Sequence, residues 1–209
     1  MEIARNRDRL GTKRRFELIG GHPALDLVNT LDWRFRDTGP EELINNYAEV
    51  VSFIEQSGMI GPNDARRLLR GVPGNKAEKI VAAVRELREA LAEILYAAIA
   101  GKSPSASSVR KLEAWLNEAT AQQQLRWEGA KLEWKLPQSP SPATPFWLLA
   151  LSAGQLVTSD QMQMLRECGN DECRWLFLDT SKNHTRRWCD MKICGNRMKA
   201  RRFKAQHRG

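Results

Sequence analysis

Most of this 209-residue chain lacks cysteine, and the whole chain lacks the long apolar runs of membrane proteins. No apolar run approaches the roughly 20 residues that a membrane-spanning helix needs, so we expect no contact with a membrane. Residues 1–15 are basic and contain no apolar stretch of the kind that a secretory signal carries. We therefore expect a cytoplasmic protein whose thiols are kept reduced.

The chain also lacks the signatures of common enzyme classes. It contains no phosphate-binding P-loop, no dinucleotide-binding glycine pattern and no arrangement of Ser, His and Asp that indicates a catalytic triad. Only three histidines are present. We expect that the protein is not an enzyme and has no catalytic residues.

All four cysteines lie in the last fifth of the chain, as two matched pairs. Cys168 and Cys173 form one C-x4-C pair, Cys189 and Cys194 form the other, and fifteen residues separate the pairs. A short loop can aim two thiolates at one point, and two such loops complete the tetrahedral shell that structural zinc prefers. We therefore predict a closed structural Zn²⁺ site formed by these four residues. Four thiolates leave no position open for a catalytic water.

Other chemistry is compatible with the same four residues. Two disulfides would need an oxidising compartment, which the basic first fifteen residues do not indicate. A four-thiolate iron–sulfur cluster and a thiol redox switch are both chemically possible. His184 or His207 could replace one cysteine, although four thiolates already fill the shell.

Positive charge is concentrated at the two ends of the chain, whose net charge is +8. Residues 182–209 contain ten Lys and Arg against one Asp, and residues 1–15 contain six against two acidic residues. The middle, residues 16–181, contains 17 basic and 22 acidic residues. A basic end on an acidic body suits a protein that binds a phosphate backbone.

The basic end predicts a helix over residues 195–208. Four basic residues spaced three or four apart would share one face of it, and their mutual repulsion would be relieved by a polyanion. The predicted nucleic-acid-binding residues of this helix are Arg197, Lys199, Arg201, Arg202, Lys204 and Arg208. Met198 and Phe203 are expected to anchor the helix on the segment that holds the four cysteines. The alternatives are a solvated, frayed basic tail and a membrane-surface segment, against which the lack of a large apolar face argues.

Apolar spacing predicts a mainly α fold: a helical N-terminal body with a small β-hairpin, followed by a C-terminal treble-clef-like zinc finger. The period changes to two over residues 125–136, which predicts a hairpin turning near Gly129 with Trp127 and Trp134 buried on its apolar face. The other predicted elements are strands at 16–19 and 174–178 and helices at 24–34, 41–56, 63–70, 76–100, 107–122 and 146–157.

A polar stretch near the start of the body could line a ligand pocket. Its candidate residues are His22, Asp26, Asn29 and Arg34, which surround a predicted turn and helix. Such groups more often cap helices and satisfy buried backbone atoms. A small-molecule pocket is therefore a second possibility for this stretch.

Three segments carry a resemblance to a known family. Residues 187–197 (RWCDMKICGNR) and 176–181 (LFLDTS) resemble the CGNR zinc finger of bacterial proteins, and residues 20–30 (GGHPALDLVNT) resemble the start of the ABATE domain that usually precedes it. This resemblance implies a stress-related transcription regulator. The expected division is a basic flexible arm at 1–15, an ABATE-like helical domain at 16–160, and a finger with a basic C-terminal helix at 161–209.

The expected function is therefore that of a zinc-dependent transcription regulator. Its finger would bind duplex DNA, and its N-terminal domain would sense a small-molecule effector or form a homodimer. Two alternatives belong to other classes. The finger and basic end could bind RNA or an acidic protein, or the helical body could serve as a small-molecule-binding or enzymatic domain.

Overall fold

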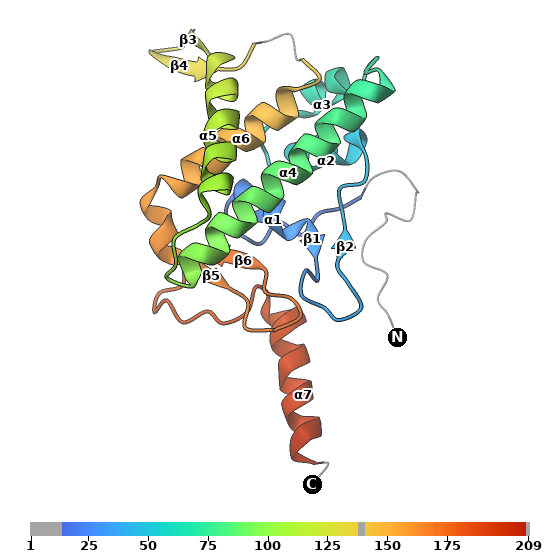
Figure 1. The fold of residues 1–209 in the computed structure, drawn as a ribbon, viewed down its shortest axis with the longest axis vertical. Helices are drawn as coiled ribbons and strands as arrows, with labels where there is room; N and C mark the ends of the chain where they lie inside the picture. Colours follow the sequence, from blue (N-terminus) through green and yellow to red (C-terminus); the bar gives the residue numbers. More distant parts are fainter. Residues whose placement is uncertain (1–13, 138–140, 208–209) are drawn as a thin grey trace.

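The computed structural model describes residues 14–137 and 141–207, so Arg208 and most of the predicted N-terminal arm lie outside the described residues. Within these ranges the chain forms helices and short antiparallel strand pairs, with the zinc-finger region at the C-terminal end (Figure 1). The predicted fold class is confirmed. The body consists of α1 (Pro23–Asn29), β1 (Leu31–Asp32), β2 (Glu41–Glu42), α2 (Tyr47–Gln56), α3 (Pro62–Leu68), α4 (Gly74–Ile99), α5 (Ala106–Ala121), β3 (Gln124–Glu128), β4 (Lys131–Lys135) and α6 (Thr144–Val157).

The core of the body lies between α4, α6 and the shorter helices that surround them. The longest helix, α4, crosses the body, and α6 packs against α5, α1 and α4 (Figure 1). As its almost continuous apolar sequence predicts, α6 is buried around most of its circumference. Gly154 permits its close approach to α5, because a Cβ at this position would lie 2.4 Å from a Leu116 methyl carbon.

Polar side chains set the start of α2 and the end of α1. The prediction that a helix starts at Glu41 was wrong: Asn46 caps α2 by accepting a hydrogen bond from the Glu49 N–H (3.0 Å), and residues 41–42 form β2 instead. The prediction that the first helix reaches Arg34 was also wrong. It ends at Asn29, where the Thr30 hydroxyl donates to the Leu27 carbonyl, and β1 follows.

Two smaller predictions also differ from the structure. Residues 16–19 form no strand, because the Gln56 side chain accepts from the Phe16 N–H (3.0 Å) and donates to the Arg14 carbonyl (2.8 Å) in place of a strand partner. Helix α3 begins at Pro62 after Gly61, rather than with Asn63 as its cap, because proline fits the first helical turn.

The hairpin forms as predicted, but its burial is inverted. Leu125 pairs with Trp134 and Trp127 pairs with Leu132 on one face, and these four side chains are 52–68% exposed. The expectation that the tryptophans are buried was therefore wrong. The opposite, polar face turns toward α3 and α6, where its charged side chains line a pocket together with α3 residues.

The finger follows α6 at the lower end of the body in Figure 1. It consists of η1 (Asp160–Met164), β5 (Leu165–Glu167), β6 (Leu176–Leu178), η2 (Met191–Gly195) and α7 (Asn196–Gln206). Strands β5 and β6 pair antiparallel, so the predicted strand at 174–178 exists but is shorter. Among the described residues, no helix is long and apolar enough to cross a membrane.

Candidate metal centre and basic helix

The four cysteine sulfurs converge on one point. The Sγ atoms of Cys168, Cys173, Cys189 and Cys194 all lie within 4.8 Å of one another, and all four residues are buried. The Sγ–Sγ distance is 3.7 Å from Cys173 to Cys189 and 3.6 Å from Cys189 to Cys194. A tetrahedron of sulfurs with Zn–S bonds of about 2.3 Å has edges of about 3.8 Å, so the four thiolates fit one zinc ion.

The same geometry does not fit two disulfides, an iron–sulfur cluster or a histidine ligand. A disulfide needs sulfurs about 2.05 Å apart, and all four cysteines are free. A cluster of several iron atoms would hold its thiolates farther apart than one ion does. Neither His184 nor His207 belongs to the group: the His184 ring is hydrogen-bonded to the Asp179 carbonyl, and the His207 ring stacks on Phe203 in α7.

The first cysteine pair is held by a tight loop between β5 and β6. The Cys168 N–H donates to the Trp175 carbonyl (2.8 Å), and the Cys173 N–H donates to the Asn170 carbonyl (2.8 Å). Asn170 is fully buried and its side-chain amide donates to the Cys194 sulfur (3.6 Å), so it links the two pairs. Asn170 was not among the predicted site residues, although the run Cys-Gly-Asn occurs twice, at Cys168 and at Cys194.

The second pair is held where the last helix begins. The Asp190 carboxylate caps η2 by accepting from the N–H groups of Lys192 and Ile193, and its carbonyl accepts from the Cys194 N–H (3.0 Å). The η2 turn therefore carries Cys194 directly into α7. The prediction that the second pair lies at the start of the last helix is confirmed by this arrangement.

A buried carboxylate organises the loop between the two halves of the finger. Asp179 accepts hydrogen bonds from the Ser181 hydroxyl and N–H and from the Arg186 N–H. These bonds, the one from the Ser181 hydroxyl foremost, lower the pKa of Asp179. The carboxylate is therefore retained as an anion that fixes the course of the loop.

The four thiols perturb one another strongly. Hydrogen bonding with neighbouring thiols, Cys173 first among them, lowers the pKa of Cys168, whereas hydrogen bonding with Cys168 raises the pKa of Cys173 and Cys189. Because like charges this close repel one another, the four sulfurs cannot all be ionised without a cation between them. A bound Zn²⁺ supplies that cation and keeps all four thiolates deprotonated.

An apolar shell surrounds the sulfurs, and one of its members comes from the body. Trp175 and Phe177 belong to the finger, but the buried Trp33 follows β1. Trp33 has a positive φ of 51°, an unfavourable conformation for a bulky residue. The Arg197 guanidinium of α7 lies over its ring, 4.3 Å from the centroid. Trp33 therefore contacts both the metal centre and the basic helix.

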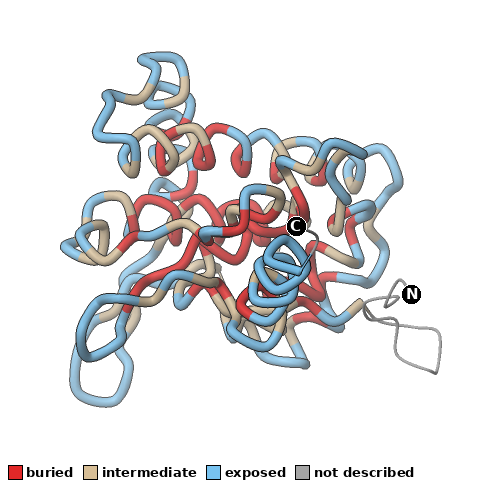
Figure 2. The backbone as a smooth tube through the Cα atoms, turned by 90° about the horizontal axis from the view of Figure 1, so that it is seen from below, coloured by how far each residue is buried: buried red, intermediate tan, exposed pale blue. Residues whose placement is uncertain are grey.

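Helix α7 projects away from the body and has no buried residue. Figure 2 looks along it and shows exposed residues around most of its circumference. The expectation that Phe203 anchors α7 was wrong, since Phe203 is 61% exposed and stacks on His207; Met198 is half-buried. The helix therefore depends on its first turn for support.

Two of the predicted nucleic-acid-binding residues make contacts within the chain. Arg197 stacks on Trp33, and Arg201 forms an ion pair with Glu172 of the first cysteine loop (2.6 Å). Within residues 14–137 and 141–207, no ion pair engages Lys199, Arg202 or Lys204. Trp33 and Glu172 have no sequence signal for these contacts, because the contacts depend on the tertiary structure.

The finger is bound to the body through backbone groups. The Asn29 amide donates to the Leu176 carbonyl and its oxygen accepts from the Leu176 N–H, each at 2.9 Å. The Leu178 N–H donates to the Gly20 carbonyl (2.8 Å), and the Tyr96 hydroxyl donates to the Arg174 carbonyl (2.8 Å). Strand β6 is thus held by α1 and Gly20 as well as by β5, and α4 holds the residue Arg174 just before it.

The four residues predicted to form a ligand pocket have separate structural contacts. His22 caps α1, Asp26 accepts from the Gly20 N–H (2.8 Å), Asn29 holds Leu176, and Arg34 is paired with Glu89. None of these contacts supports a ligand site, so the pocket stays a prediction.

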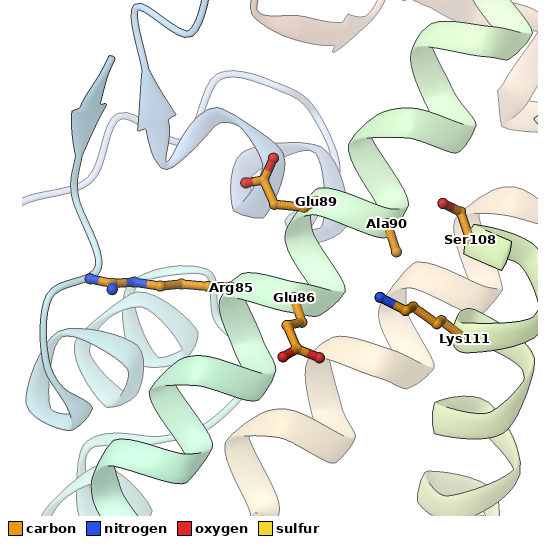
Figure 3. Close-up of a pocket in the computed structure, with 6 residues that line it drawn as sticks. All are labelled: Arg85, Glu86, Glu89, Ala90, Ser108 and Lys111. Atoms are coloured by element: carbon orange, nitrogen blue, oxygen red, sulfur yellow. The ribbon is translucent and has the colours of Figure 1, made fainter. Parts of the chain in front are cut away.

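A shallow pocket of about 340 Å³ lies elsewhere, between α4 and α5 (Figure 3). Glu86 and Lys111 face each other across it, while Arg85 points away toward the Ile44 carbonyl, to which it donates. Glu89, at the same edge, is held by Arg34 and Arg88. Glu89 is therefore already neutralised, and the pocket does not by itself indicate a ligand.

The fold and the site together define a helical protein with a C-terminal zinc finger whose four thiolates hold structural zinc. The chain belongs to the ABATE family, whose model matches residues 21–160 and is described as "Putative stress-induced transcription regulator". The CGNR zinc finger matches residues 164–207. These matches confirm the resemblance seen in the sequence and describe a zinc-binding regulatory protein; neither is an enzyme family. No curated protein matches the chain.

Proposed function

We propose that this protein is a zinc-dependent transcription regulator that binds duplex DNA through α7. One observation carries the proposal. An exposed helix of eleven residues, with five Lys and Arg and no acidic residue, begins at the metal-held turn and extends away from the body. A helix of this kind offers positive charge to phosphates and has the dimensions that the major groove accepts.

The contacts of α7 suggest which side faces DNA. Arg197 and Arg201 lie one turn apart and contact Trp33 and Glu172, so this side faces the rest of the protein near the start of the helix. Lys199 and Arg202 lie on the opposite side and are exposed, as are Phe203 and Gln206 at the matching spacing. In our proposal, Lys199 and Arg202 bind phosphates or guanine edges.

Arg197 and Arg201 then act mainly by orienting the helix. A guanidinium over a tryptophan ring and an ion pair with the first cysteine loop both restrain the direction in which α7 leaves the finger. Lys204 lies farther along α7, where it can add a phosphate contact. Zinc stabilises the turn on which all of these positions depend.

A salt titration of DNA binding tests the proposal. Affinity of the zinc-loaded full chain for a mixed-sequence 20-base-pair duplex would be measured by fluorescence anisotropy at several salt concentrations. Each phosphate contact contributes about 0.9 to the slope of log K against log salt. We expect the Lys199→Ala/Arg202→Ala variant to lower that slope by about two units.

The matched control is Lys76→Ala/Lys79→Ala, which removes two exposed charges from the opposite end of the body. We expect its slope to equal that of the unchanged protein. Equal slopes for all three proteins would contradict the proposal. Selection of bound fragments from a genomic DNA pool, with and without a zinc chelator, would then identify the preferred sequence.

A further inference from the structure

The β3–β4 hairpin exposes an apolar face that the rest of the described chain does not cover. Its four large side chains have exposed fractions of 52% (Leu125), 68% (Trp127), 56% (Leu132) and 61% (Trp134). Tryptophan is rarely so exposed, and a contiguous patch of large apolar side chains on a water-soluble surface commonly marks an interaction site.

The orientation of the hairpin accounts for this exposure. Arg126 and Glu133 form its half-buried centre on the other face, which turns toward α3 and α6. Within the described residues, the sheet of the hairpin consists of β3 and β4 alone. The apolar face therefore points outward.

Leu and Trp alternate on the apolar face, both along each strand and across the two strands. Leu125 lies opposite Trp134, and Trp127 lies opposite Leu132 on the neighbouring pair of that face. Along each strand and across the strands, every Leu therefore has a Trp as its neighbour. When two such faces are brought together about a two-fold axis that lies in the plane between them, parallel or perpendicular to the strands, each Trp of one copy meets a Leu of the other. Large side chains then pack against smaller ones, as in a well-packed core.

The available area reaches the range of a specific contact. At the observed exposures, the four side chains offer roughly 500 Å² per copy, or about 1,000 Å² for a pair. This is the threshold of about 1,000 Å² for a biological interface and lies below the roughly 1,200–2,000 Å² of stable ones, which corresponds to a weak, reversible dimer.

The charge around the face favours a second copy over a lipid surface. Lys131 and Lys135 are both paired with Glu133, at 3.0 and 2.8 Å, and Arg126 lies opposite Glu133 in the register. Over residues 124–135, three basic side chains stand against two acidic ones, so the net charge is +1. The hairpin therefore carries little of the positive charge with which interfacial segments bind anionic lipids. A two-fold contact between identical surfaces needs no such charge.

We propose that the apolar face of the hairpin is a self-association surface through which two copies of this chain form a symmetric dimer. Leu125, Trp127, Leu132 and Trp134 of each copy form the contact. The hairpin and α7 lie at opposite ends of the molecule, so the dimer leaves both basic helices accessible (Figure 1). The proposal does not depend on DNA binding.

Sedimentation equilibrium of the zinc-loaded full chain, at about 1–200 µM and without DNA, tests it. We expect a concentration-dependent rise from the 23.8 kDa mass of one chain toward twice that mass. Trp127→Thr/Trp134→Thr, which keeps residues suited to a strand, is expected to weaken the dimer at least about thirtyfold. A second variant, Leu125→Lys/Leu132→Lys, keeps both tryptophans and is expected to give the same result.

The control variant is Leu69→Gln, which changes an exposed apolar residue of the body outside the hairpin, 48% exposed, and should leave the dimer intact. Zinc content and circular dichroism would establish that each variant is folded. A protein that stays monomeric at all concentrations would overturn the proposal, and so would a dimer that both hairpin variants leave unchanged. The unmodified protein could also stay monomeric and bind neutral or anionic vesicles. If the Trp variant does not bind those vesicles, the face would be assigned to lipid instead.

Discussion

The pKa of the Asp26 carboxyl group lies far above the ordinary value for aspartate. The side chain is buried in α1 and accepts a hydrogen bond from the Gly20 N–H (2.8 Å). Burial raises its pKa from 3.8 to about 7, although hydrogen bonds from the backbone of Gly20 and Ile19 oppose the shift. At neutral pH the folded protein therefore retains part of a proton that the unfolded chain has released.

This proton makes stability depend on pH in a definite direction. Because the folded pKa is the higher one, the contribution of Asp26 is fully present below pH 4 and is lost as pH rises through 7. Between pH 6 and 8 we expect the free energy of unfolding to fall by about 1 kcal/mol for this reason. Asp26→Asn keeps an acceptor for Gly20 and should remove that fall, as measured by denaturant unfolding at each pH.

The matched control for this measurement is Asp37→Asn, which makes the same chemical change at an exposed position. Its pH profile should be that of the unchanged protein. A profile of Asp26→Asn that still falls by the same amount would show that another group is responsible.

At single positions, sequence predicted best where chemistry fixes the neighbours. Structural zinc needs four ligands around one point and thiolate is a preferred one, so Cys168 and its three partners could be identified from spacing alone. Alternation in the hairpin fixed which side chains share a face, but not which face meets the body. The prediction that Trp127 and Trp134 share a face is therefore confirmed. The prediction that this face is buried in the core was wrong.

At the scale of elements, α1 and β6 are joined by one side chain. Both polar groups of the Asn29 amide bond the backbone of Leu176, in a buried position 147 residues away in sequence. Asn29 thus supplies β6 with the donor and acceptor that a further strand would otherwise provide. The link substitutes for strand pairing because it satisfies both backbone groups of Leu176.

Removal of this amide should be costly. Asn29→Ala leaves a buried N–H and a buried carbonyl without partners, and we expect a loss of about 2–4 kcal/mol in the free energy of unfolding. Hydrogen exchange should report faster opening at the Leu176 amide. Asn45→Ala, which removes an exposed side chain that donates to the Glu42 carbonyl, serves as the control and should cost much less. A loss below 1 kcal/mol for Asn29→Ala would contradict this role.

Element boundaries were predictable where a local cap exists. Asn46 and Glu49 have the spacing of a helix-capping pair, and this signal would have given the start of α2. The end of α1 had a weaker signal, since it depends on Thr30, on pairing with β2 and on the left-handed Trp33. Contacts between distant segments decide such boundaries, and a single sequence does not contain them.

At the scale of the molecule, the metal centre connects the body to α7. Trp33 of the body packs beside the cysteines and under Arg197, while Asn29, Gly20 and Tyr96 hold the strand and loop of the finger. The main core and the apolar cluster around the cysteines are nevertheless separate. Loss of zinc should therefore affect the finger far more than the body.

Zinc removal should unfold α7 while most of the body stays helical. The helix has eleven residues, five of them basic and none buried, so in isolation it is too short and too strongly charged to be stable. We expect a chelator to remove the part of the far-ultraviolet helical signal due to α7, and one equivalent of zinc per chain to restore it. The same chelator already loaded with zinc is the control. Complete loss of helix would mean that the body also needs the metal, and an unchanged signal would mean that the first turn of α7 is held by Trp33, Glu172 and the η2 turn alone.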